Sequence, residues 1–438
     1  MESWAPLMKG FGLATQFHTT PLKRLSPPFQ HVIVALVYMV IGLVIAGQFV
    51  DGLYSPTLLY PLLMLQTIRL MRQPFSSSLA LVTGVSFLVL YAVYGPNLLI
   101  FSGIDPSLTI AMFIVFSDVI KKYSDSPFPY VKEPKIEQHK TIYWLGLTMS
   151  CIAITTVYAF VQRSDLGLIV PLGCALFFQE ALLRNGAGKT GAFIALGMVE
   201  LALAVYLLLL WSGFGRLVIA SLLLLPFATH SAYHPTILRF WHFVVALPVL
   251  IAVATVVRGG SIEDVTSSKA GGVTDHMLLT ADLQSGFLVG SGKVQSFIDQ
   301  YLLFFLNWFP REIWSGKPIG AGAYAVDVFW GRAHYGEEHN VSLGFVGDQI
   351  FALGHWYMIG LFVILVTIVC VRRLLIHYSP IIHKSPLIAF DTMLLTFFWG
   401  GMASFGSRVW FAVAPLVILA LLSKALSRKP ETHPHTPL

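Results

Sequence analysis

Apolar segments of about 20 residues recur along most of this chain, and this pattern limits its fold more than any other feature. A helix of that length crosses the hydrocarbon core of a bilayer. Hydrophobic residues make up 56% of the sequence and charged residues only 11%, which excludes a soluble globular protein. The sequence therefore predicts an all-α polytopic membrane protein.

We expect about twelve transmembrane helices. The sequence shows no internal repeat and no low-complexity run. One integral domain is therefore expected over residues 1–438, with the first span kept as an anchor. The predicted spans are residues 31–50, 54–70, 77–95, 98–120, 141–161, 166–183, 190–211, 217–233, 241–257, 342–371, 386–405 and 408–426.

Basic residues give the orientation, because cytoplasmic loops retain lysine and arginine. Lys9, Lys23 and Arg24 precede the first span, and basic residues follow nearly every even-numbered span, as in the stretch from Arg372 to Lys384 after the tenth. Both termini are therefore predicted to be cytoplasmic. The net charge of +6 is then a signal of topology, and we expect no nucleic-acid partner.

This orientation places one long polar loop, residues 258–340, on the outer face. The loop holds six Lys or Arg residues and nine Asp or Glu residues, so its few cations suggest specific anion contacts and not a broad basic patch. Cys151, Cys174 and Cys370 all fall in predicted spans, where we expect core packing and no disulfide framework.

Three arginines stand at predicted outer ends of spans, against the usual charge bias. Arg216 follows Gly213-Phe214-Gly215, Arg408 follows Gly406-Ser407, and Arg258 precedes Gly259-Gly260. Each alone is equally well explained as a side chain that reaches lipid phosphate. Together they favour a site for a diphosphate, because guanidinium groups bind phosphate oxygens in bidentate fashion.

Within the loop, residues 307–318 combine aromatic residues, two cations and two prolines. Trp308 and Trp314 are candidates for stacking on sugar faces, with an ordinary interfacial aromatic belt as the alternative. Lys317 follows Gly316, but Pro318 comes next where a phosphate-binding P-loop requires Ser or Thr.

A general base is suggested by His339, which follows Glu337-Glu338 and precedes Asp348 by nine residues. A solvated histidine is the plainer alternative. The sequence contains no mixed Cys/His cluster and no Asp-x-Asp pair, so we expect neither a metal nor a cofactor. The acidic residues of the spans instead leave open an ion path, through Asp105, Asp118, Glu180, Glu200 and Asp391.

The second half of the chain, about residues 211–426, resembles the O-antigen (Wzy-type) oligosaccharide repeat-unit polymerases of bacterial inner membranes. The resemblance rests on the stretch from Phe309 to Pro318, on His339, and on Gly344-Phe345-Val346-Gly347-Asp348 with Gly354. The Gly-Phe-Gly-Arg216 corner and Ser407-Arg408-Val409 are also similar to theirs.

This resemblance implies a GT-C-like, metal-independent, inverting glycosyltransferase of the bacterial inner membrane. It would transfer a glycan at the periplasmic face from one undecaprenyl diphosphate carrier onto a repeat unit on another. The expected partners are these lipid-linked oligosaccharides, the lipid bilayer and a chain-length regulator protein.

The resemblance also implies roles for individual residues. Arg216, Arg258 and Arg408 would hold the donor diphosphate, and Arg311 and Lys317 would contact phosphate or acceptor sugar. His339 would be the base, with Asp348 orienting or replacing it. Glu312 and Glu338 are further candidates for the base.

Two other functions stay open from the sequence. An O-antigen ligase would use a similar arrangement of arginine and histidine to transfer the glycan to lipid A core. A flippase or secondary transporter of lipid-linked sugars would place its cations along a central cavity, between paired broken helices.

Overall fold

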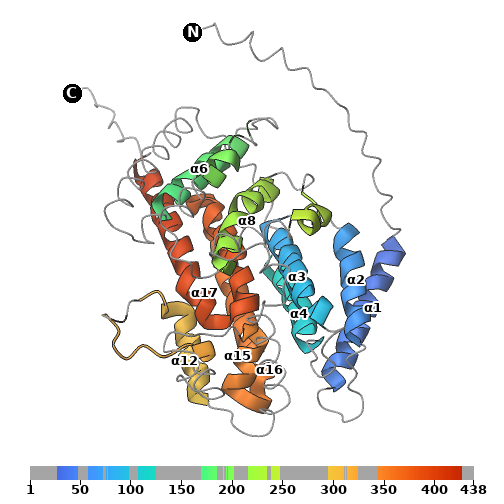
Figure 1. Ribbon diagram of the computed structural model, residues 1–438. Helices are drawn as coiled ribbons and strands as arrows, with labels where there is room; N and C mark the ends of the chain where they lie inside the picture. Colours follow the sequence, from blue (N-terminus) through green and yellow to red (C-terminus); the bar gives the residue numbers. More distant parts are fainter. Residues whose placement is uncertain are drawn as a thin grey trace, which may run out of the picture.

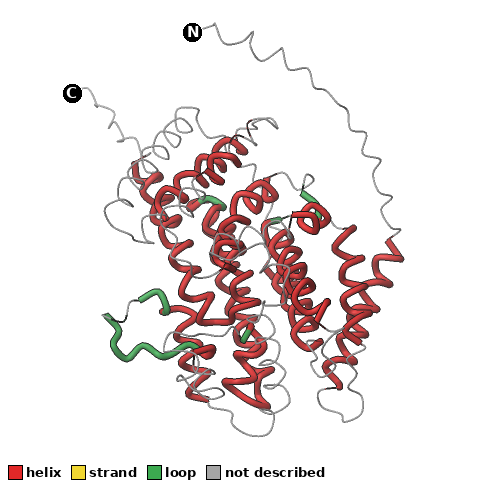
Figure 2. Tube along the Cα trace, in the orientation of Figure 1, coloured by secondary structure: helices red, strands yellow, loops and turns green. Residues whose placement is uncertain are grey.

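The computed structural model describes residues 27–47, 58–72, 75, 77–97, 107–124, 169–184, 191, 194, 196–201, 216–233, 238–246, 294–309, 311, 313–323 and 343–426. Helices form the framework of these ranges, and Figures 1 and 2 show them side by side in a bundle. The elements are α1 (Pro27–Gly47), α2 (Leu59–Arg72), α3 (Ser78–Asn97), α4 (Ser107–Ser124), α6 (Ile169–Arg184), α8 (Arg216–Tyr233), α12 (Val294–Leu306), α15 (Gly344–Leu353), η5 (Gly354–Trp356), α16 (Tyr357–Ile382) and α17 (Ser385–Leu426).

Three helical stretches in the described ranges are long and apolar enough to cross a membrane, namely Gln30–Gly47, Gly344–Ser379 and Ser385–Leu421. Shorter apolar helices accompany them at Leu59–Met71, Ser78–Leu90 and Phe297–Leu306. Large apolar side chains such as Met64 and Phe362, each 65% exposed, point away from the bundle, as expected where lipid replaces water. The prediction of an all-α membrane protein is confirmed at this level. The number of spans and their orientation stay predictions.

Helix α17 is the centre of the bundle, because α3, α6, α8, α12, α15 and α16 all pack against it. Aromatic side chains fill much of the core around it. Phe113 on α4 lies edge-on to Phe398, with ring centroids 4.7 Å apart, and Phe345 on α15 lies 5.5 Å from the same ring. Such rings bury large areas and prefer these tilted arrangements.

The beginning of α17 is held by a carboxylate from another helix. Glu180 on α6 is fully buried, and its oxygens accept hydrogen bonds from the backbone N–H groups of Lys384 and Ser385 at 3.1 and 3.2 Å. The hydroxyls of Ser385 and Tyr233 also donate to Glu180, at 2.5 and 2.8 Å. An anion at a helix N-terminus satisfies N–H groups that have no partner within the helix.

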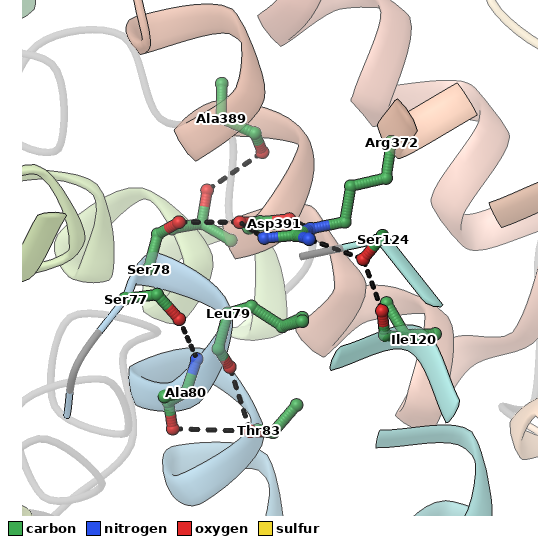
Figure 3. A network of polar contacts seen from close by, with 11 residues as sticks. Ser77, Ser78, Leu79, Ala80, Thr83, Ile120, Ser124, Arg372, Ala389 and Asp391 are labelled. Carbon is green, nitrogen blue, oxygen red and sulfur yellow. Dashed lines mark hydrogen bonds and ion pairs between the residues drawn. The ribbon is translucent and has the colours of Figure 1, made fainter. Parts of the chain in front are cut away.

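One residue used for the orientation lies elsewhere than predicted. Arg372 was expected in a cytoplasmic boundary after a span that ends at residue 371, but α16 continues to Ile382 and buries Arg372 to 2% exposure. Its Nε donates to Asp391 Oδ1 on α17 at 2.8 Å, and its Nη1 donates to Ser124 Oγ on α4 at 2.5 Å (Figure 3). Ser78 on α3 donates to Asp391 Oδ2 at 2.6 Å. This network therefore joins four helices.

A second expectation was wrong for Cys370, which was assigned to the core. The residue is a free cysteine on the exposed side of α16. Cys151 and the side chain of Cys174 lie outside the described residues.

Candidate functional site

Helix α17 is broken at Gly401, where the backbone has φ 75° and ψ −165°. These angles belong to a region that is essentially restricted to glycine. A Cβ atom at this position would also overlap the carboxylate of Asp348. Two adjacent apolar spans had been predicted at residues 386–405 and 408–426, but the helix changes course at Gly401 and then continues through residues 406–408. We call Gly401 and the two residues that follow it the α17 break.

Asp348 is the carboxylate at the α17 break. It lies on α15, only 2% of its surface is exposed, and its Oδ2 accepts a hydrogen bond from the backbone N–H of Met402 at 2.8 Å. The neighbouring Gln349 is fully buried and directs its Nε2 toward the sulfur of Met402 at 3.1 Å. Asp348 thus caps the second half of α17, as Glu180 caps the first.

A loop from the predicted outer segment docks onto the same break. Asn307, immediately after α12, donates through Nδ2 to the carbonyl oxygen of Ala403 at 2.7 Å. Gln300 on α12 fixes the far end of the loop, because its side chain accepts from Ala321 N at 2.9 Å and donates to Ile319 O at 3.2 Å. These bonds anchor both ends of residues 307–309, 311 and 313–323, which we call the cation loop.

Two residues that were predicted to bind phosphate, Lys317 and Arg311, form hydrogen bonds to the backbone of their own loop. Lys317 Nζ donates to the carbonyl oxygens of Asn307 and Phe309 at 2.6 and 2.9 Å. Arg311 donates through Nη1 to Lys317 O at 2.8 Å and through Nη2 to Pro318 O at 3.3 Å. Arg311 is exposed and has five N–H donors, so its contacts within the loop leave donors for a ligand.

The two candidate tryptophans lie on the cation loop. Trp308 is 39% exposed, and its ring lies 4.0 Å from that of Phe309 with an interplanar angle of 30°. Its Nε1 donates to Phe305 O at 3.0 Å, so the indole is held in place with part of its surface open. Trp314 is half-buried.

Arg408 lies in the second half of α17, where it is half-buried and donates through Nη1 to Ser404 O at 2.8 Å. Helix α12 crosses α17 very closely at this point, because a Cβ on Gly406 would overlap the carbonyl oxygens of Leu303 and Phe304. The indole of Trp410 donates to Phe304 O at 2.9 Å. Arg408 follows the α17 break by a few residues on the same helix, and it does not start a helix as predicted.

Arg216 is the first residue of α8, as the glycine-rich corner before it predicted. The opposite end of α8 meets the beginning of α17, since Tyr233 and Ser385 share Glu180. Helix α8 has 18 residues, and α17 runs 16 residues from Ser385 to Gly400, so at about 1.5 Å per residue they are similar in length. The two helices pack along each other, which brings the backbone of Arg216 to about the level of the break.

The remaining candidates lie outside the described residues: Arg258, Glu312, Glu338 and His339. The structure therefore brings Asp348 and the cation loop to the α17 break, with Arg408 further along the same helix. The predicted base, His339, lies outside the described residues. Within the described ranges, no group of three or more His, Cys, Asp or Glu side chains could hold a metal ion. Metal-independent transfer stays a prediction.

The sequence analysis missed Gly401 and Gln349, which are part of this arrangement. A signal for the break was present in the sequence, because Gly400 and Gly401 stand side by side within an otherwise apolar span. No such signal marked Gln349.

The fold and this site define an all-α integral membrane protein with a broken helix at its centre. No protein-family model matches the chain, and no curated protein or solved structure matches it significantly.

Proposed function

We propose that this protein is an inverting glycosyltransferase that polymerises undecaprenyl-diphosphate-linked oligosaccharide repeat units at the periplasmic face of the bacterial inner membrane. One observation carries the proposal: the cation loop docks through Asn307 onto the α17 break, which Asp348 caps and which Arg408 follows on the same helix. The loop that carries Arg311 and Lys317 is thereby attached to the helix that carries Arg408. That arrangement suits a diphosphate, whose oxygens accept charge-assisted hydrogen bonds.

In the proposed reaction, an acceptor hydroxyl oxygen attacks the anomeric carbon of the donor glycan. The bond from that carbon to the diphosphate oxygen breaks, and the diphosphate leaves with the electron pair. The hydroxyl proton passes to a base, for which His339 is our candidate. Arg408, Arg311 and Lys317, with Arg216 and Arg258, would stabilise the negative charge that develops on the leaving diphosphate.

Asp348 has a positioning role in this proposal. Its carboxylate accepts a hydrogen bond from the backbone N–H of Met402, so it fixes the shape of the α17 break and hence the place where Ala403 receives the cation loop. Trp308 and Trp314 would offer apolar ring faces to the sugars.

The direct test supplies the purified protein, in a bilayer, with lipid-linked repeat units and separates the products by size. A ladder of longer glycans is expected. Arg408→Lys should weaken extension at normal protein levels, because lysine lacks the planar fork of arginine. Arg373→Lys is the matched control, since Arg373 is an exposed arginine of α16 whose Nε donates to Tyr123 O at 2.6 Å. Equal activity of both variants would remove Arg408 from the site. Transfer to added lipid A core in place of a ladder would identify a ligase.

One observation favours a second function, transport of lipid-linked sugars. Transporters bind substrates at discontinuous helices, and α17 is discontinuous at Gly401. However, Asp348 already accepts the first N–H of the second half, where a transporter would present positive charge to an anionic substrate. Movement of labelled lipid-linked oligosaccharide across proteoliposomes, with no change in its length, would support transport over polymerisation.

A further inference from the structure

A small polar pocket lies between α2, α3 and α4, and the proposed glycan transfer makes no use of it. Apolar residues close its inner side, and its volume is about 30 Å³. The polar residues that line it are Gln66, Arg69, Thr83, Ser117, Asp118 and Lys121.

The negative charge in this pocket is already neutralised. Arg69 donates through Nη1 and Nη2 to the two oxygens of Asp118, both at 2.7 Å, in a bidentate ion pair. Tyr38 on α1 donates its hydroxyl to Asp118 Oδ2 at 2.9 Å. Asp118 therefore accepts three hydrogen bonds and is paired with Arg69, and Lys121 leaves the pocket with a net positive charge.

Donors without acceptors remain in the pocket. Arg69 Nε is buried and forms no hydrogen bond within the described part of the chain. Ser117 is 8% exposed, and its Oγ is also buried without a partner there. Buried polar groups in native proteins almost always find partners, so these two donors and the Lys121 ammonium together favour a ligand rich in acceptors.

The size of the pocket limits that ligand. A space of about 30 Å³ holds one or two atoms of the size of a water oxygen, which excludes a sugar ring. Arg69 and Asp118 are 15% and 19% exposed, so the pocket opens to the surface and a larger ligand can leave most of its bulk outside. A phosphate group fits these limits, because one or two of its oxygens can enter while the rest stays at the mouth.

We propose that this pocket binds a phosphate group, supplied by the headgroup of an anionic phospholipid or as free inorganic phosphate. Helix α2 also carries exposed apolar side chains close in sequence to the lining residues, such as Met71, which is 50% exposed. Acyl chains can lie against such a surface while the headgroup reaches the pocket.

The test measures binding to the purified full-length protein with two probes. Native mass spectrometry counts bound phosphatidylglycerol, with phosphatidylcholine at the same concentration for comparison. Equilibrium dialysis with radiolabelled inorganic phosphate tests the free anion. Lys121→Gln and Ser117→Ala keep the pair of Arg69 with Asp118, and each should weaken binding roughly three- to tenfold.

Lys122→Gln is the matched control, because it removes one positive charge from the residue next to Lys121. The ammonium of Lys122 lies over the ring of Tyr123. This variant should keep binding near the wild-type level. Binding of phosphatidylglycerol alone identifies a headgroup site, and binding of inorganic phosphate alone identifies a site for the free anion. Absence of binding by both probes, or an equal loss for Lys121→Gln and Lys122→Gln, overturns the proposal.

Discussion

At the scale of single residues, Gly401 is a position where both the backbone angles and the packing exclude a side chain. An alanine there would adopt φ near 75° with its Cβ inside the volume of Asp348. Gly401→Ala should therefore lower the free energy of unfolding by at least the roughly 1–3 kcal/mol that such backbone strain costs. Thermal unfolding in detergent measures this effect.

Gly42→Ala is the control for Gly401→Ala, because a Cβ at Gly42 on α1 meets no atom within 4 Å. Alanine also favours a helix over glycine, so this control should be as stable as the wild type or slightly more stable. Equal melting temperatures for the two variants would show that the α17 break can relax around a side chain.

The proposed base gives a second prediction at this scale. A positioned base contributes about 10²–10⁴-fold to a rate, so His339→Ala should slow glycan extension by that factor while donor binding is retained. Asp348→Asn should have a smaller effect, since an amide oxygen can still accept the N–H of Met402. Turnover of the purified variants decides the assignment, and near-wild-type turnover of His339→Ala would move the role to Glu312 or Glu338.

At the scale of helices, the ion pair of Arg372 and Asp391 connects α16 to α17 where both side chains are buried. Removing one partner of a buried pair leaves an uncompensated charge, which typically costs about 3–5 kcal/mol. Arg372→Met and Asp391→Leu should each destabilise the protein strongly. The double variant should lose less than the sum of the two, because no charge is left behind.

A double-mutant cycle on the midpoint of unfolding measures this coupling. Arg373→Met is the control, since Arg373 is exposed and its bond goes to a backbone carbonyl of α4. Strict additivity of the two single substitutions would mean that the pair contributes no coupling to the packing of α16 on α17.

At the scale of the whole molecule, the predicted orientation places residues 258–340 outside the membrane and both termini inside. Alkaline phosphatase is active only in the periplasm, so a fusion at Gly290 should be active and a fusion at Lys429 inactive. An inactive Gly290 fusion, with the protein present at normal levels, would reverse the predicted topology and move the cation loop to the cytoplasm.

Hydropathy predicted the class of fold and several helices closely, because long apolar segments have few alternatives to a helix in lipid. Helix α8 begins at Arg216 and ends at Tyr233, against a predicted span of 217–233. The same signal misplaced Arg372, since a buried charge that finds its partner on another helix is indistinguishable in sequence from a charge in a loop.

The candidate site was predictable in part. The sequence singled out Asp348, Arg408, Arg311 and Lys317. The structure brings Asp348 and the loop of Arg311 and Lys317 to the α17 break, and Arg408 follows the break on the same helix. Their contacts could not be foreseen, because they depend on the approach of α12 and α15 to α17. The backbone N–H of Met402 can donate to Asp348 because the break at Gly401 interrupts the hydrogen bonding within α17.

The two carboxylates that hold α17 also suggest an order of assembly. Glu180 receives the start of the helix and Asp348 receives its second half, and both residues precede α17 in the chain. When a ribosome delivers α17 to the bilayer, α6 and α15 have already been synthesised. Helix α17 therefore enters the bilayer after the two carboxylates that accept its N–H groups. These N–H groups can find their acceptors at once, without later parts of the chain.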